Sequence, residues 1–225
     1  NKLKNTQIIS VINQKGGVGK TTTVINLATA LSMNNKKVLV IDLDPQGNAT
    51  TGFGISNNDD TKTIYDVLNG NANFEDTIKD TKIDNLQLVS SNVDLSGLEV
   101  ETANESRKAF LLKDKIENFI NSTKNDFSYI FIDCPPSLSL LTIMSLVVAK
   151  SLIVPLQAEF FALEGLSQLM QTIDRVKNKL NPTLEIRGVL LTMFDKRNKL
   201  SAQVDADARE FFKEKVYQTI IPRNV

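Results

Sequence analysis

A glycine-rich segment near the beginning of the chain, residues 15–22, constrains the fold more than any other stretch. It has the sequence Lys-Gly-Gly-Val-Gly-Lys-Thr-Thr. Glycines at three of these positions allow the backbone to turn its N–H groups toward a single anion. A lysine and a hydroxyl follow, at the spacing that serves the β/γ phosphates and Mg²⁺ in a phosphate-binding loop. The segment therefore predicts a strand, a phosphate-binding turn and a helix in direct succession.

The flanking residues supply that context. Four of residues 8–12 are isoleucine or valine, as in a buried strand, and residues 22–33 carry apolar side chains at helical spacing. Within the loop, Lys20 is expected to contact the phosphates and Thr21 the Mg²⁺. Gln14 occupies the place where such loops usually begin with glycine. The residues expected to bind the nucleotide here are Lys15, Gly16, Gly17, Val18, Gly19, Lys20, Thr21 and Thr22.

The rest of the chain alternates apolar runs with helical patterns. Continuously apolar strands are typical of a parallel sheet that is covered on both faces. We therefore predict an α/β fold: one domain over residues 1–225, with a mostly parallel central sheet of about seven strands and helices on both faces. The expected strands are residues 8–12, 38–41, 86–89, 129–132, 152–154, 186–194 and 216–221, and the expected helices are 22–33, 110–120, 163–180 and 202–213.

Three aspartates follow predicted strands. Asp42 and Asp44 end the strand at residues 38–41, which is expected to neighbour the strand that enters the glycine loop. Ligands bind at the carboxyl ends of such strands. Asp44 is the preferred residue for orienting water, and Asp133 has the form of a second acid that supports Mg²⁺. The alternatives are a solvated acidic turn at residues 42–44 and an ordinary strand-end aspartate at 133.

Composition removes several kinds of chemistry. The chain has no histidine, which excludes imidazole bases and histidine-ligated metals. Its one cysteine, Cys134, is interpreted as a buried small residue and not as a nucleophile. The chain has 26 lysine and arginine residues and 26 aspartate and glutamate residues. The net charge therefore indicates neither a nucleic-acid partner nor a membrane partner. No apolar run approaches the ~20 residues of a membrane span.

Several segments together resemble the ParA/Soj family of chromosome- and plasmid-partitioning ATPases, whose phosphate loop is a deviant Walker A motif. The likeness spans nearly the whole chain and includes the unusual Gln14. The segments that carry it are residues 13–23, 42–50, 133–138, 162–166, 188–195 and 221–225.

The resemblance implies an ATP hydrolase that uses ATP and Mg²⁺, with Lys15 and Asp44 as catalytic residues. Lys15 would be the signature lysine that reaches across a homodimer closing over two ATP molecules, although a solvated loop lysine is the alternative. Thr21, Asp44 and Asp133 would hold the metal. Further contacts at the adenine end are implied for Thr192, Met193, Pro222 and Arg223.

The family also implies that the ATP-bound dimer binds double-stranded DNA without sequence preference. The basic cluster Lys196, Arg197 and Lys199 is then the candidate contact, although it could equally be a solvated turn. A ParB-type centromere-binding protein is the implied stimulator of slow hydrolysis. The expected location is the cytoplasm, on the nucleoid, with no membrane partner.

One alternative is a MinD-like positioning ATPase that cycles on membranes. It would need a basic amphipathic helix at the C-terminus. We expect a further C-terminal segment beyond residue 225, so this alternative stays open. A relative of the nitrogenase iron protein is disfavoured, because it needs two cysteine ligands in each subunit and only Cys134 is present.

Overall fold

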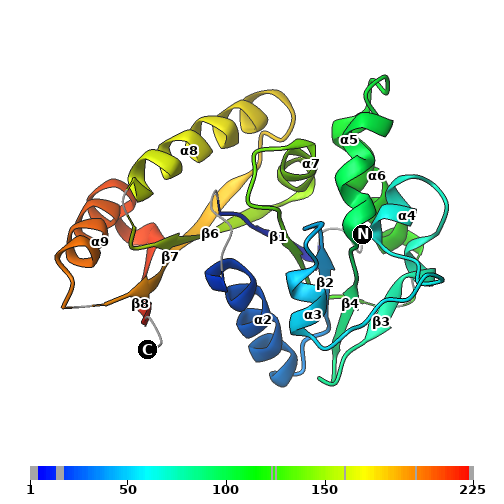
Figure 1. Ribbon diagram of the computed structural model, residues 1–225, viewed down its shortest axis with the longest axis horizontal. Coiled ribbons are helices and arrows are strands. Elements are labelled where there is room, and N and C mark those ends of the chain that lie inside the picture. The colour runs from blue at the N-terminus through cyan, green and yellow to red at the C-terminus, as the bar shows by residue number, and fades with distance from the viewer. Residues whose placement is uncertain are drawn as a thin grey trace.

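A twisted eight-stranded sheet forms the centre of the molecule, with helices on both faces (Figure 1). The computed structural model describes residues 5–13, 18–122, 124, 126–159, 161–195 and 197–222. The strand order is β3-β4-β2-β5-β1-β6-β7-β8, and all neighbours are parallel except β3 and β4. The strands are β1 Gln7–Val11, β2 Val38–Asp42, β3 Ile78–Asp80, β4 Leu86–Val89, β5 Tyr129–Asp133, β6 Ser151–Gln157, β7 Glu185–Phe194 and β8 Val216–Pro222.

The helices divide between the two faces of this sheet. Helices α2 and α3 cover one face, and α6, α7 and α8 lie on the other (Figure 1). The helices are α2 Val18–Met33, α3 Asn48–Gly52, α4 Ile64–Leu68, α5 Leu98–Glu101, α6 Leu111–Ser122, α7 Leu140–Val148, α8 Ala162–Lys179 and α9 Lys199–Phe212. Short 3₁₀ turns are η1 Phe74–Asp76, η2 Val93–Gly97, η3 Lys108–Phe110 and η4 Lys213–Lys215.

Successive residues of β1 show how the sheet supplies both cores. Ile9 and Val11 pack with Val24 of α2, whereas Ile8 and Ile12 join the larger cluster on the opposite face. This follows from the two-residue period of a strand, which sends alternate side chains to opposite faces. Burial on both faces explains why β1 is mostly apolar, as expected of a covered parallel strand, and the hydroxyl of the buried Ser10 donates to Ser145 O.

The predicted fold class is confirmed, and the structure adds a strand and several helices. The sheet has one strand more than expected, because β3 pairs antiparallel with β4 at the edge. This three-residue strand lies in a polar stretch and carries no apolar pattern. Helix α7 was also not predicted. Eight of its nine residues are buried, so no polar face marks its helical period.

The predicted neighbour of β2 is wrong. Strand β5 lies between β2 and the glycine-loop strand β1, and it pairs with both in parallel. The register places Asp133 opposite Asp42 on one side and opposite Val11 on the other. The aspartates at the ends of β2 and β5 therefore meet at the carboxyl edge of the sheet, beside the loop that follows β1.

Candidate functional site

Helix α2 begins earlier than the sequence pattern indicated, at Val18 instead of Thr22. Gly19, Lys20 and Thr21 therefore lie in its first turn, where backbone N–H groups have no partner within the helix. Such a terminus favours an anion through its free donors and its dipole. The earlier loop positions Gln14, Lys15, Gly16 and Gly17 lie outside the described residues.

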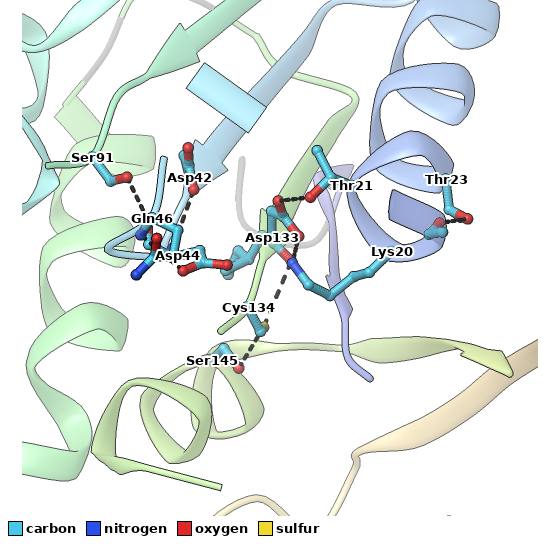
Figure 2. Close-up of polar contacts among 12 residues, drawn as sticks. Lys20, Thr21, Thr23, Asp42, Asp44, Gln46, Ser91, Asp133, Cys134 and Ser145 are labelled. Atoms are coloured by element: carbon cyan, nitrogen blue, oxygen red, sulfur yellow. Dashed lines mark hydrogen bonds and ion pairs between the residues drawn. The ribbon is translucent and has the colours of Figure 1, made fainter. Parts of the chain in front are cut away.

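Lys20 and Thr21 both contact the carboxylate of Asp133 (Figure 2). The Lys20 ammonium forms a buried ion pair with Oδ1, and Thr21 Oγ1 donates to Oδ2 at 3.1 Å. Burial raises the pKa of Asp133, while the Lys20 charge opposes that rise. The predicted phosphate-binding cation, the predicted Mg²⁺ hydroxyl and the predicted metal-supporting acid thus meet at one point.

The carboxylate of Asp42 is held by hydrogen bonds from nearby residues. Its Oδ2 accepts hydrogen bonds from Thr50 N at 2.8 Å and Thr50 Oγ1 at 2.6 Å, and Oδ1 accepts one from Asp44 N at 3.1 Å. Burial, with a smaller effect of the Asp133 charge, raises the pKa of Asp42 to about 6. These contacts make Asp42 a support for the loop that carries Asp44.

Asp44 is buried and lies near Asp133. Its Oδ1 accepts a hydrogen bond from Gln46 N at 3.0 Å, and its charge contributes to the raised pKa of Asp133. In the described part of the chain, no three His, Cys, Asp or Glu side chains form a ready-made metal cage. That fits Mg²⁺, which takes few protein ligands and completes its shell with water and phosphate oxygens. Thr21, Asp133 and Asp44 are the side chains that would hold it.

The start of α2 also lies against the end of β7. An added Cβ on Gly19 would lie 3.0 Å from Thr192 Oγ1 and 3.1 Å from Gln157 Nε2, so a larger residue would force these side chains or the helix start to move by a few tenths of an ångström. The Thr192 hydroxyl is buried and has no hydrogen-bond partner among the described residues. Buried polar groups are normally hydrogen-bonded, so a ligand bound at the N-terminus of α2 could supply the missing partner of this hydroxyl.

The other residues expected at the adenine end are only partly placed. Met193 is half-buried with a left-handed φ of 58°, and the backbone of Pro222 pairs with Phe194 at the end of β7. Thr192 and Pro222 are thus on neighbouring strands. Arg223 lies outside the described residues. Sequence reasoning missed Gln157 and Thr50. It also missed Ser91, whose place just beyond the end of β4, as the second residue after the strand, was the one available signal.

Cys134 is a buried small residue, as predicted. Its Sγ lies 3.0 Å from Ser145 Oγ, and burial raises the pKa of its thiol to about 12. A thiolate nucleophile is not available from such an environment.

The basic cluster lies in the segment that joins β7 to α9. Arg197 is exposed, and its Nε lies 3.3 Å from Asp195 Oδ1. Lys199 is exposed as the first residue of α9. Lys196 lies outside the described residues.

A strand, a glycine-rich sequence that leads into a helix, and acids at the adjoining strand end define a P-loop nucleoside triphosphatase. A family profile described as an AAA domain matches residues 6–186. The chain is 50% identical over 219 residues to the chromosome partitioning protein ParA of Caulobacter vibrioides, covering 97% of this chain and 81% of that protein. It is 47% identical to the sporulation initiation inhibitor protein Soj of Bacillus subtilis, over 97% of this chain and 85% of Soj. The chain belongs to the ParA/Soj family of partitioning ATPases.

Solved structures agree on the fold. A cobyrinic acid a,c-diamide synthase from Mycobacterium smegmatis, with bound ATP analogue and magnesium, superposes with a TM-score of 0.89 at 35% identity, covering 97% of this chain and 85% of that one. A plasmid partition protein from Borrelia burgdorferi gives a TM-score of 0.84 at 30% identity, covering 98% and 91%. No helix among the described residues has the length and apolar content to cross a bilayer.

Proposed function

We propose that residues 1–225 form an ATPase domain that works as an ATP-driven switch in DNA segregation. ATP would close a homodimer, the dimer would load onto DNA, and a partner protein would stimulate hydrolysis and release. The observation that carries this proposal is the convergence of Lys20, Thr21 and Asp133 at the start of α2, in a chain 50% identical to a chromosome partitioning protein.

Nucleotide binding would rearrange the buried cluster. Lys20 would exchange part of its contact with Asp133 for the β and γ phosphates, whose charge replaces that of the carboxylate. Thr21 and Asp133 would then face Mg²⁺, which supplies charge neutralisation for the phosphates. The orphaned hydroxyl of Thr192 beside Gly19 would gain a partner from the nucleotide.

Slow hydrolysis follows from the groups at the site. Asp44 is the carboxylate placed to orient an attacking water, because Asp42 is fully occupied by Thr50 and the Asp44 backbone. No histidine is present to act as a stronger base. Catalysis therefore rests on positioning and on electrostatic stabilisation of the phosphoryl group. Such a site responds to a partner that improves the positioning.

A second copy of the chain would complete the site. A hollow of about 500 Å³ borders it, lined by Asn13, Pro136, Gln157 and Phe161 among others. Phe161 is 79% exposed and has a left-handed φ of 62°, which is costly for a non-glycine residue and points to a functional constraint. A dimer across this hollow would bury the ring. It would also bring Lys15 of one copy toward the other copy's γ-phosphate, as an arginine finger does.

Dimerisation would double a modest basic surface. The exposed residues Arg197 and Lys199, with Lys196, would contact phosphates and not bases. Two such patches on one duplex raise the apparent affinity of a chain with no net charge. We assign the nucleoid as the working location and a ParB-type centromere-binding protein as the stimulating partner.

The test is DNA binding with ATP, ADP or no nucleotide across a salt series. Wild type is compared with Lys15→Ala, and with Lys36→Ala as a matched control, since Lys36 is an exposed lysine outside the site. We expect binding that needs ATP, weakens with salt and disappears only in Lys15→Ala. Binding that ignores the nucleotide overturns the proposal. Binding of anionic liposomes in place of DNA would favour the MinD-like alternative.

A further inference from the structure

Four residues form a closed ring of hydrogen bonds around the backbone of Asp44. Asp44 N donates to Asp42 Oδ1 at 3.1 Å, and Thr50 Oγ1 donates to Asp42 Oδ2 at 2.6 Å. Ser91 closes the ring from another strand end. Its N donates to Thr50 Oγ1 at 3.2 Å. Its hydroxyl donates to Asp44 O at 2.6 Å (Figure 2).

We propose that Ser91 is a positioning residue for ATP hydrolysis, which acts by holding the main chain of Asp44. This inference rests on the proposed role of Asp44 in orienting water. Ser91 does not itself contact the Lys20–Asp133 pair in the structure. It acts through Asp44.

The ring holds Asp44 from both sides. Asp42 holds its N–H and Ser91 its carbonyl oxygen, so the peptide planes that flank the Asp44 Cα are both fixed. The other supports of the Asp44 carbonyl and carboxylate, Gly47 N at 2.9 Å and Gln46 N at 3.0 Å, come from the same short loop and would move with it. Ser91, the second residue after β4, instead ties the loop to the sheet.

The Ser91 hydroxyl can be removed without orphaning its partner. Asp44 O retains the hydrogen bond from Gly47 N, and the bond from Ser91 N to Thr50 uses the main chain, which any side chain preserves. Ser91→Ala is therefore expected to fold. It should let the Asp44 carboxylate move by a fraction of an ångström from its position in the wild-type protein. Displacements of this size cost catalysis heavily where rate depends on orientation, about a hundredfold for 1 Å.

The experiment measures kcat for ATP hydrolysis and the Kd for ATP separately. Ser90→Ala is the matched control, because Ser90 is equally buried in the preceding position and its hydroxyl donates to Asn57 Oδ1 at 3.0 Å, away from Asp44. For Ser91→Ala we expect kcat to fall about tenfold with Kd within about twofold of wild type. Ser90→Ala should change neither value, and Ser91→Thr, which restores a hydroxyl, should recover most of kcat.

Asp44→Ala, assayed in parallel, distinguishes failure of the proposed role of Ser91 from failure of the proposed function. If Asp44→Ala is inactive and Ser91→Ala hydrolyses ATP at the wild-type rate, the role of Ser91 is overturned while the proposed function stands. If Asp44→Ala is itself fully active, the proposed function fails first. A fall in kcat that is equal in Ser90→Ala and Ser91→Ala, or that Ser91→Thr does not recover, would indicate general destabilisation and would also overturn the positioning role.

Discussion

The ammonium of Lys20, in the first turn of α2, and the carboxylate of Asp133, at the end of β5, form an ion pair that is closed off from solvent. Neither charge is stable alone in such a place, since desolvating an unpaired ion costs several kcal/mol. The pair therefore joins helix α2 to strand β5 at the candidate site. It also keeps a cation in the interior, where the proposed nucleotide would compete for it.

Replacing Lys20 by methionine should destabilise the protein by about 3–5 kcal/mol, because Asp133 is then left as an unpaired buried charge. Adding Asp133→Asn should recover much of that loss, since the uncompensated charge is gone. Urea unfolding followed by circular dichroism measures both variants, with Lys36→Met as the exposed control. A double variant no more stable than Lys20→Met would show that the pair is not the source of the effect.

ATP affinity should depend on the close approach of α2 to β7. Gly19→Ala places a Cβ 3.0 Å from the buried Thr192 Oγ1, and we expect the start of the helix to shift to relieve this contact. We expect a Kd for ATP weakened about tenfold or more, because the shift moves the N–H groups that face the phosphates. Isothermal titration calorimetry gives the value.

Gly97→Ala is the matched control for this prediction. Its Cβ would also approach within 3.0 Å of a neighbour, but that neighbour is Oε1 of Glu101, the end of a flexible exposed side chain. ATP affinity should be unchanged in Gly97→Ala. Wild-type affinity in Gly19→Ala would contradict the close fit described for this part of the site.

The thiol of Cys134 should react only when the protein unfolds. It is fully buried, and burial raises its pKa to about 12. The rate of reaction with Ellman's reagent should therefore rise steeply across the urea unfolding transition and be negligible below it. Val100→Cys, at a position 81% exposed, provides a thiol that should react at once. Comparable reaction rates for the two thiols in the native protein would show that Cys134 is not buried.

Local chemistry made part of this site predictable. The glycine loop, Asp44 and Asp133 are recognisable because each stands next to an apolar strand, and strands and turns leave patterns within a few residues. The parallel sheet followed from continuously apolar strands for the same reason. Strand β3 escaped because three partly polar residues make no pattern.

Relationships between distant segments were not predictable in the same way. Ser91 donates to a residue 47 positions away, and this contact depends on β4 lying beside β2. The sequence offered β1 as the neighbour of β2, whereas β5 occupies that place. Thr50 and Gln157 likewise gain their roles from the strand order. The order of the strands in the sheet cannot be predicted from the local patterns of a single sequence.

The exposed ring of Phe161 should contribute to ATP-dependent self-association. It lines the hollow beside the site together with Asn13, Pro136 and Gln157, and its left-handed backbone holds it at the N-terminus of α8. Phe161→Ala should weaken the dimer formed with a non-hydrolysable ATP analogue by about tenfold, as loss of a buried aromatic anchor does. Sedimentation velocity over a concentration series measures this.

Met33→Ala is the matched control for Phe161→Ala. Met33 is 76% exposed, close to the 79% of Phe161. It is the last residue of α2, at the end of the helix away from the candidate nucleotide site. Its removal should leave the dimer unchanged, because only the surface at the carboxyl ends of the strands faces the second copy in the proposed arrangement. Equal weakening in both variants would mean that exposed apolar area drives association nonspecifically. An unchanged dimer in Phe161→Ala would place the interface elsewhere, and with it the site at which Lys15 acts.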